Sequence, residues 1–97
     1  MNIFISDKTK NKLTDKHDLK FEDIKECFCN LEGEFLTDTR EEHKTDPITQ
    51  WFIAENNRGQ LIKVCFMQQT NGDLYIKTAY EPNEIEIKIY NKFGLTK

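Results

Sequence analysis

The sequence has no apolar run long enough to cross a membrane. Apolar residues make up 37% of its 97 positions and charged residues 32%, whereas a spanning helix needs about 20 consecutive apolar residues. The first residues show no secretory signal, because the short apolar run at 3–5 precedes the lysines instead of following them. There is also no internal repeat. We therefore expect one compact domain over residues 1–97, in the cytoplasm and without a membrane partner.

A disulfide framework is also missing. The three cysteines, Cys27, Cys29 and Cys65, are odd in number and lack framework spacing, which is typical of reduced thiols in a cytosolic protein. On a helix, Cys27 and Cys29 point roughly 200° apart, so they do not converge on one metal ion. We expect all three to be buried small apolar groups, and we expect no metal and no cofactor.

The chain lacks the positive charge expected of a protein that binds nucleic acid through phosphates alone. Its net charge is −3, and residues 21–60 hold four basic against ten acidic groups. Residues 1–20 hold five lysines against three aspartates, and residues 61–97 hold five basic groups against four acidic ones. RNA is a ligand only if these mildly basic ends converge in space; the alternative is a solvated surface of mixed sign. We do not expect DNA binding by the chain alone.

Periodicity and turn signals predict the order βααββββα, a small α+β domain with two or three helices packed on an antiparallel sheet. A polar loop is predicted for 38–47. The predicted elements are a strand at 2–6, helices at 8–16 and 21–30, strands at 34–37, 51–54, 61–67 and 74–80, and a helix from Asn83 to the stop at Gly94.

The second and third helices carry the clearer helical patterns. Phe21, Ile24 and Phe28 recur at helical spacing, which predicts an amphipathic helix. At the start of the last helix, Asn83 can act as the cap and Glu86 can complete a capping box. The apolar stripe of that helix is expected at Ile85, Ile89 and Tyr90.

Two hairpin turns join the last three strands. The pair Asn71-Gly72 is the strongest short hairpin signal. A two-residue loop there pairs Thr70 with Asp73 and sets Lys63 opposite Tyr80. The same register sets Cys65 opposite Thr78 and Phe66 opposite Lys77.

The first hairpin, with a turn of two or four residues within 56–59, places Trp51 and Ile53 on the sheet face of Lys77. Phe52 and Ala54 then share the face of Lys63. Both faces carry apolar residues, so the pattern does not predict which face the helices cover. A lysine in the middle of a strand needs a partner or water for its ammonium group.

Several short motifs resemble one known family. Lys16-His17, followed by Phe21-Glu22-Asp23 and Phe28, is similar to "KHGVSFEEAxxVF" of the BrnT-like toxins of bacterial toxin-antitoxin pairs. Further along, 78–80 (Thr-Ala-Tyr) stands where that family has "SAR", and Glu86 with Tyr90 matches its closing "ExxxY". The resemblance implies the RelE-type ribonuclease fold, an RNA substrate and an antitoxin or other protein as partner.

A closer subgroup is similar through "DTREEHKTDP", "WFIAENNRGQLIKV" and "IKTAYEPNE" and carries the label ADP-ribosyl-(dinitrogen reductase) hydrolase. Hydrolases of that name are much larger and use paired metal ions. This chain has neither their length nor an obvious carboxylate cluster, and three adjacent residues such as Glu41-Glu42-His43 rarely bind a metal unaided. We attribute the label to a transfer error.

The chain departs from the toxin pattern at three positions. The glycine after Lys-His is Asp18, the capping serine is Lys20, and the arginine of "SAR" is Tyr80. The family's arginine is a candidate for stabilising the cleaved phosphate. Ribonuclease activity here therefore requires that Lys77, Lys63 or Arg40 replace it.

A metal-independent ribonuclease needs a base for the 2′-hydroxyl proton, cations for the charge on the phosphorane, and an acid for the leaving oxygen. His17 or a lysine can act as the base, and Tyr80 or His43 as the acid. The catalytic candidates are His17, Arg40, Lys77 and Tyr80, and the candidates for RNA contact are Lys16, Lys63 and Arg58.

Each catalytic candidate also has a purely structural interpretation. His17 at a helix end can cap carbonyl groups, and Arg40 can form a weak surface ion pair. Lys77 can extend its ammonium group to solvent, and Tyr80 can close a strand end.

Two functions follow. The first is a small cytoplasmic toxin of a toxin-antitoxin system that acts as a metal-independent ribonuclease. The second is a non-catalytic binding or immunity-type module of the same fold, whose acidic middle (Glu22 to Glu55) engages a basic protein.

Overall fold

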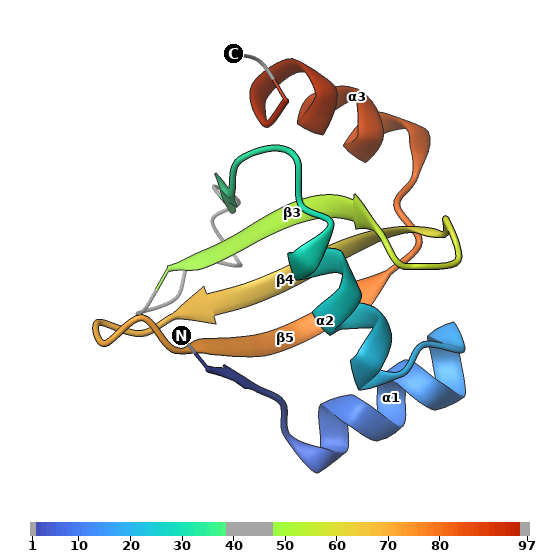
Figure 1. The fold of residues 1–97 in the computed structure, drawn as a ribbon, viewed down its shortest axis with the longest axis vertical. Helices are drawn as coiled ribbons and strands as arrows, with labels where there is room; N and C mark the ends of the chain where they lie inside the picture. Colours follow the sequence, from blue (N-terminus) through green and yellow to red (C-terminus); the bar gives the residue numbers. More distant parts are fainter. Residues whose placement is uncertain (1, 39–47, 96–97) are drawn as a thin grey trace.

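The computed structural model describes residues 2–38 and 48–95, which form an α+β domain (Figure 1). The predicted fold class and the order βααββββα are confirmed. The elements are β1 (Ile3–Phe4), α1 (Asp7–His17), α2 (Phe21–Cys29), β2 (Leu36–Thr37), β3 (Thr49–Glu55), β4 (Leu61–Gln68), β5 (Leu74–Tyr80) and α3 (Glu84–Phe93).

The five strands of the described residues form one sheet with the order β1-β5-β4-β3-β2. The pairs β2–β3, β3–β4 and β4–β5 are antiparallel, but β1 pairs with β5 in parallel. The expectation of a purely antiparallel sheet was therefore wrong. A two-residue strand carries no sequence signal for its orientation, and β1 reaches the far edge of the meander only through its docking beside β5.

The turn between β3 and β4 has three residues, 57–59, because the Asn56 N–H donates to the Gln60 carbonyl at 3.0 Å. Gly59 has φ +78°, the left-handed conformation that such loops require. The predicted loop length of two or four residues was therefore wrong by one residue. A shift of one residue in the pairing exchanges the side chains of the two sheet faces, so the predicted faces of this strand were wrong as well. Ile53 consequently lies opposite Lys63, and Trp51 shares that face.

The turn between β4 and β5 likewise has three residues, 70–72, because the Gln69 N–H donates to the Asp73 carbonyl at 2.8 Å. Gly72 has φ +92°. The predicted two-residue loop with Thr70 opposite Asp73 was therefore wrong. The strands begin one residue out of the predicted register.

A β-bulge beside Cys65 and Phe66 restores that register. Beyond it Cys65 lies opposite Thr78 and Lys63 opposite Tyr80, as predicted. Phe66 lies opposite Ile76 and not Lys77, which is the extra residue of the bulged strand.

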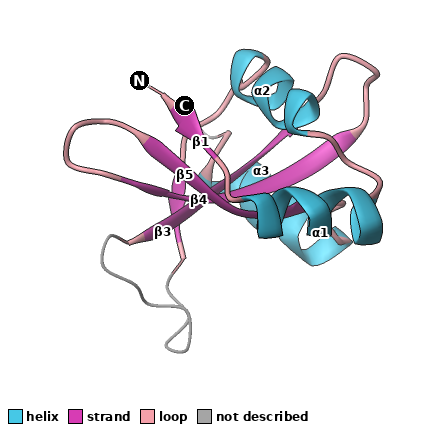
Figure 2. Cartoon of the chain, turned by 90° about the horizontal axis from the view of Figure 1, so that it is seen from below, coloured by secondary structure: helices cyan, strands magenta, loops and turns pink. Residues whose placement is uncertain are grey.

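Helices cover both faces of the sheet (Figures 1 and 2). On one face the Phe28 ring of α2 lies 4.7 Å from the Phe52 ring, centroid to centroid. On the other, the Tyr90 ring of α3 lies 5.7 Å from Trp51. Because Trp51 and Phe52 are consecutive in a strand, their side chains point to opposite faces. The remaining helix, α1, packs along β5.

The α3 capping box is confirmed. The Asn83 side chain accepts a hydrogen bond from the Glu86 N–H at 2.8 Å, and the Glu86 carboxylate accepts one from the Asn83 N–H at 3.0 Å. The predicted stripe was largely wrong, since Ile85 is 69% exposed and Ile89 41%. The contact of Tyr90 with Trp51 rotates Ile87, and not Ile85 or Ile89, toward the core.

Of the three cysteines, Cys27 and Cys65 are buried, as expected, while Cys29 is exposed. Burial, with the nearby charges of Asp23 and Glu26, raises the pKa of the Cys27 thiol to about 12. Cys27 is therefore a neutral thiol of the core. Cys29 falls on the opposite side of α2 because of the same 200° separation that argued against a shared metal.

Candidate functional site

Lys63 is buried in the middle of the sheet and forms an ion pair with α3. It is 5% exposed, and its Nζ lies 2.6 Å from Glu86 Oε2. The ammonium group also lies 4.5 Å from the centroid of the Trp51 ring. Burial lowers the pKa of Lys63, but the hydrogen bonds to Glu86 and Tyr80 outweigh it, so the pKa is raised from 10.5. Lys63 is therefore charged at neutral pH.

Glu86 uses both carboxylate oxygens. Oε1 accepts the capping bond from Asn83, and Oε2 accepts bonds from Lys63 Nζ at 2.6 Å and from the Tyr80 hydroxyl at 3.0 Å. Burial opposes its charge, yet the bonds from Lys63, Asn83 and Tyr80 prevail and lower the pKa of Glu86 from 4.5. A single carboxylate thus joins the start of α3 to two strands.

Tyr80, at the end of β5, also contacts the Lys-His motif. The His17 and Tyr80 ring centroids lie 6.0 Å apart, with the planes tilted by 39°. Burial raises the pKa of the Tyr80 hydroxyl, although Lys63 partly offsets it. The hydroxyl is therefore neutral at physiological pH.

Helix α1 ends directly after His17, where Asp18 takes the left-handed conformation with φ +52°. Glycine is usual at this position after a helix, and aspartate is among the few residues that tolerate it. The departure from the family's glycine therefore leaves the helix end intact. His17, the last residue of α1, lies beside Tyr80 of β5.

The strand β3 ends, β4 begins and β5 ends at the same end of the sheet (Figure 1). Most of the described candidates lie at this end. His17, Lys63 and Tyr80 are brought together there. Lys16 is exposed in the last turn of α1, and Lys77 is exposed at the bulge. Arg40 and the alternative acid His43 lie outside the described residues.

Arg58 lies in the β3–β4 turn, with its side chain 62% exposed, and it forms an ion pair with Asp23 Oδ1 at 3.2 Å. The buried Asp23 also accepts bonds from the Lys20 N–H at 2.8 Å and from Asn56 Nδ2 at 3.2 Å. These contacts tie the turn to the start of α2. Arg58 thus has a structural partner in addition to its predicted contact with RNA.

Sequence reasoning missed the position of Glu86 in this site, because its capping role already explained it. Two signals were available: a lysine inside a strand needs an opposite charge, and the capping box starts only three residues after Tyr80. The carboxylate of such a box is close enough to the strand end to supply that charge.

Two pockets flank the sheet on the α3 side. The first, here named the Trp51 pocket, has a volume of about 530 Å³ and apolar walls from Leu36, Trp51, Ile89 and Phe93. Its polar lining residues are Thr37, Asp38, Lys63 and Glu86. It is therefore continuous with the site.

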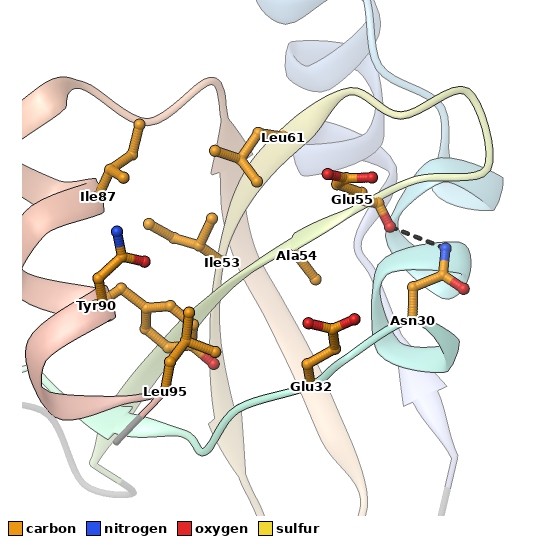
Figure 3. A pocket seen from close by; sticks show the side chains of 10 residues that line it. Asn30, Glu32, Ile53, Ala54, Glu55, Leu61, Ile87, Tyr90 and Leu95 are labelled. Atoms are coloured by element: carbon orange, nitrogen blue, oxygen red, sulfur yellow. Dashed lines mark hydrogen bonds between the residues drawn. The ribbon is translucent and has the colours of Figure 1, made fainter. Parts of the chain in front are cut away.

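The second pocket, here named the Glu55 pocket, has a volume of about 490 Å³ and contains none of the predicted site residues (Figure 3). Ile53, Leu61 and Ile87 line it, together with the acidic Glu32 and Glu55. The Asn30 side chain donates to the Glu55 carbonyl at 2.9 Å, which closes one side.

Among residues 2–38 and 48–95, no group of three or more His, Cys, Asp or Glu side chains is arranged to hold a metal ion. In the same ranges no helix has the length and apolar character of a membrane span.

The solved structure of the Brucella abortus ribonuclease toxin BrnT is similar to this chain. The two superpose with a TM-score of 0.62 over 87% of this chain and 99% of BrnT, at 17% sequence identity. No protein-family model and no curated protein matches the sequence. The likeness shows a BrnT-like fold, and none of the comparisons supports the ADP-ribosyl hydrolase label.

Proposed function

We propose that this chain is the toxin of a toxin-antitoxin pair and acts in the cytoplasm as a metal-independent ribonuclease. The observation that carries the proposal is the meeting of His17, Tyr80 and Lys63 at one end of the sheet. The fold that brings them together is shared with a protein described as a ribonuclease toxin.

The three side chains suit the parts of RNA cleavage. His17 is the proposed base or acid, because imidazole exchanges protons near neutral pH. Tyr80 supplies a neutral hydroxyl donor, and Lys63 supplies a fixed positive charge close to it. Glu86 balances the charge of Lys63. The additional positive charge that RNA phosphates require is assigned to Lys16, Lys77, Arg58 and Arg40.

The test is growth of a bacterial host after induced expression, with total RNA examined in parallel. The native chain should arrest growth and degrade RNA. His17→Ala should lower cleavage by about 10²-fold or more, as loss of an acid or base does, and Tyr80→Phe, Lys77→Ala and Arg40→Ala should each weaken it. Lys88→Ala, exposed on α3, is the matched control and should behave as the native chain.

A folded native chain that neither slows growth nor cuts RNA rules out the catalytic proposal. The alternative, a binding or immunity-type module for a basic protein, then stands. The acidic lining of the Glu55 pocket favours it, since Glu32 and Glu55 flank apolar residues that can receive the stem of a lysine or arginine. A neighbouring reading frame for a DNA-binding antitoxin supports the toxin, and one for a large secreted toxin supports immunity.

A further inference from the structure

The Trp51 pocket has no part in the proton transfers proposed above, although it shares Lys63 and Glu86 with the site. Its volume of about 530 Å³ and its apolar walls with a few polar groups are typical of pockets that bind small ligands.

The walls suit a flat ligand. Phe93 is 58% exposed and Ile89 41%, so both side chains present open surface at the edge of the pocket. The Trp51 ring, in contrast, is only 9% exposed, with the Lys63 ammonium 4.5 Å and the Tyr90 ring 5.7 Å from its centroid. Phe93 is therefore the aromatic surface on which a planar group can stack.

The polar groups suit a planar ligand with polar edges. Lys63 and Glu86 line the pocket from β4 and α3, and Thr37 and Asp38 line it from the end of β2. The Lys92 ammonium lies over the Phe93 ring, 5.3 Å from its centroid. A nucleobase has apolar faces and polar edges, and in RNA the ribose attached to it carries a negatively charged phosphate.

We infer that the Trp51 pocket binds a nucleobase of the RNA substrate. The inference rests on the proposed function and specifies its substrate subsite. The contacts run from Lys63 to Glu86 at 2.6 Å, from Glu86 to Tyr80 at 3.0 Å and from Tyr80 to His17 at 6.0 Å between rings. A base held at Lys63 therefore directs its phosphate toward Tyr80 and His17.

Trp51 is the only tryptophan of the chain and lines the pocket, so its fluorescence is the readout of binding there. The folded native chain is titrated with AMP, GMP, CMP and UMP, and the emission is corrected for absorption by the nucleotide. At least one nucleotide should produce a saturable change. Ribose 5-phosphate, which has the phosphate without the base, should produce none.

Two variants on the same helix sharpen the titration. Phe93→Ala should weaken nucleotide binding about tenfold, as loss of a stacking side chain does. Ile85→Ala is the matched control, because Ile85 is 69% exposed on α3 and does not line the pocket. It should leave the affinity unchanged. Both positions are exposed, so both variants should fold.

The inference is overturned if no nucleotide changes the emission, if ribose 5-phosphate acts as well as the nucleotides, or if Phe93→Ala binds as tightly as Ile85→Ala. In the first case the apolar surface of Ile85, Ile89 and Phe93 is left to a protein partner. RNA cleavage without nucleotide binding refutes only the subsite. Nucleotide binding by a chain that leaves RNA intact refutes the ribonuclease and leaves the pocket as a nucleotide site without an RNA substrate.

Discussion

The two faces of the sheet differ in what they bury. The face under α2 holds four phenylalanines, Phe28, Phe35, Phe52 and Phe66, whose ring centroids lie 4.7 to 6.3 Å apart. The face under α3 holds the ion pair of Lys63 and Glu86 beside Trp51. The strands β3 and β4 therefore carry an apolar core on one side and a polar cluster on the other.

The difference separates residues that stabilise the fold from residues that folding alone does not explain. Burial of phenylalanine rings stabilises a fold without further conditions. A buried ion pair contributes little net stability, because desolvation cancels most of its attraction. Lys63 and Glu86 are thus poorly explained by folding alone. This contrast supports the choice of the α3 face as the site.

The strongest way to separate the faces is a truncation on the apolar side. Phe52 is fully buried, so Phe52→Ala should lower the free energy of unfolding by about 4 kcal/mol, through lost burial and the cavity left behind. Ile85→Ala, on the exposed side of α3, should change it by less than about 0.5 kcal/mol. Urea denaturation measures both. A loss below about 1 kcal/mol for Phe52→Ala contradicts the assignment of the core.

On the polar side, the predicted loss of stability depends on whether one charge of the Lys63–Glu86 pair is removed or both are. Glu86→Gln should cost about 3 kcal/mol, because it leaves the Lys63 charge buried without its counter-charge. The double variant Lys63→Met with Glu86→Gln should recover most of that loss. Glu84→Gln, at an exposed position two residues earlier in α3, is the control. The single variant Lys63→Met completes the double-mutant cycle, and additive effects, measured by urea denaturation, contradict the coupling.

The same pair predicts a dependence on pH in the acid range. The pKa of Glu86 is lowered in the folded state from its ordinary 4.5. The unfolded chain then binds the proton first, so the contribution of Glu86 is complete above pH 4.5 and is lost as the pH falls through the folded-state value. One group changes the free energy of unfolding by at most about 1.4 kcal/mol per pH unit. The native chain should lose more stability below pH 4.5 than the double variant does; equal losses contradict the prediction.

The smallest effect is expected at the cap of α3. Asn83→Ala removes the bond to the Glu86 N–H and should cost about 1 kcal/mol. Asn83→Asp keeps an acceptor and serves as the control, with a change below about 0.5 kcal/mol. Thermal unfolding detects both. If Asn83→Ala has the same melting temperature as the native chain, the cap does not hold the start of α3 in place.

Much of the fold was predictable because its signals are local. The strand Leu74–Tyr80 has its predicted limits, and the capping box of Asn83 and Glu86 forms as expected. Helix α2 also lies where its apolar spacing predicts it. In each case the residues that determine the structure are neighbours in the sequence.

The faces of the sheet were not predictable from the same signals. The turn residues at 56–59 and Asn71-Gly72 predicted loops of two or four residues, but both turns have three, and one residue decides which side chains share a face. The orientation of α3 also failed, since Ile85 and Ile89 mimic a buried stripe. Only the contact between Tyr90 and Trp51 decides it.

For the site, the sequence by itself determined the ingredients: a histidine at a helix end, a lysine inside a strand, and a tyrosine before a capped helix. Only the tertiary structure decided that His17 lies beside Tyr80 and that Glu86 receives Lys63. The physical reason is the distance along the chain. His17 and Tyr80 are 63 positions apart, and they meet because α1 packs against β5, a contact that depends on every turn and strand register between them.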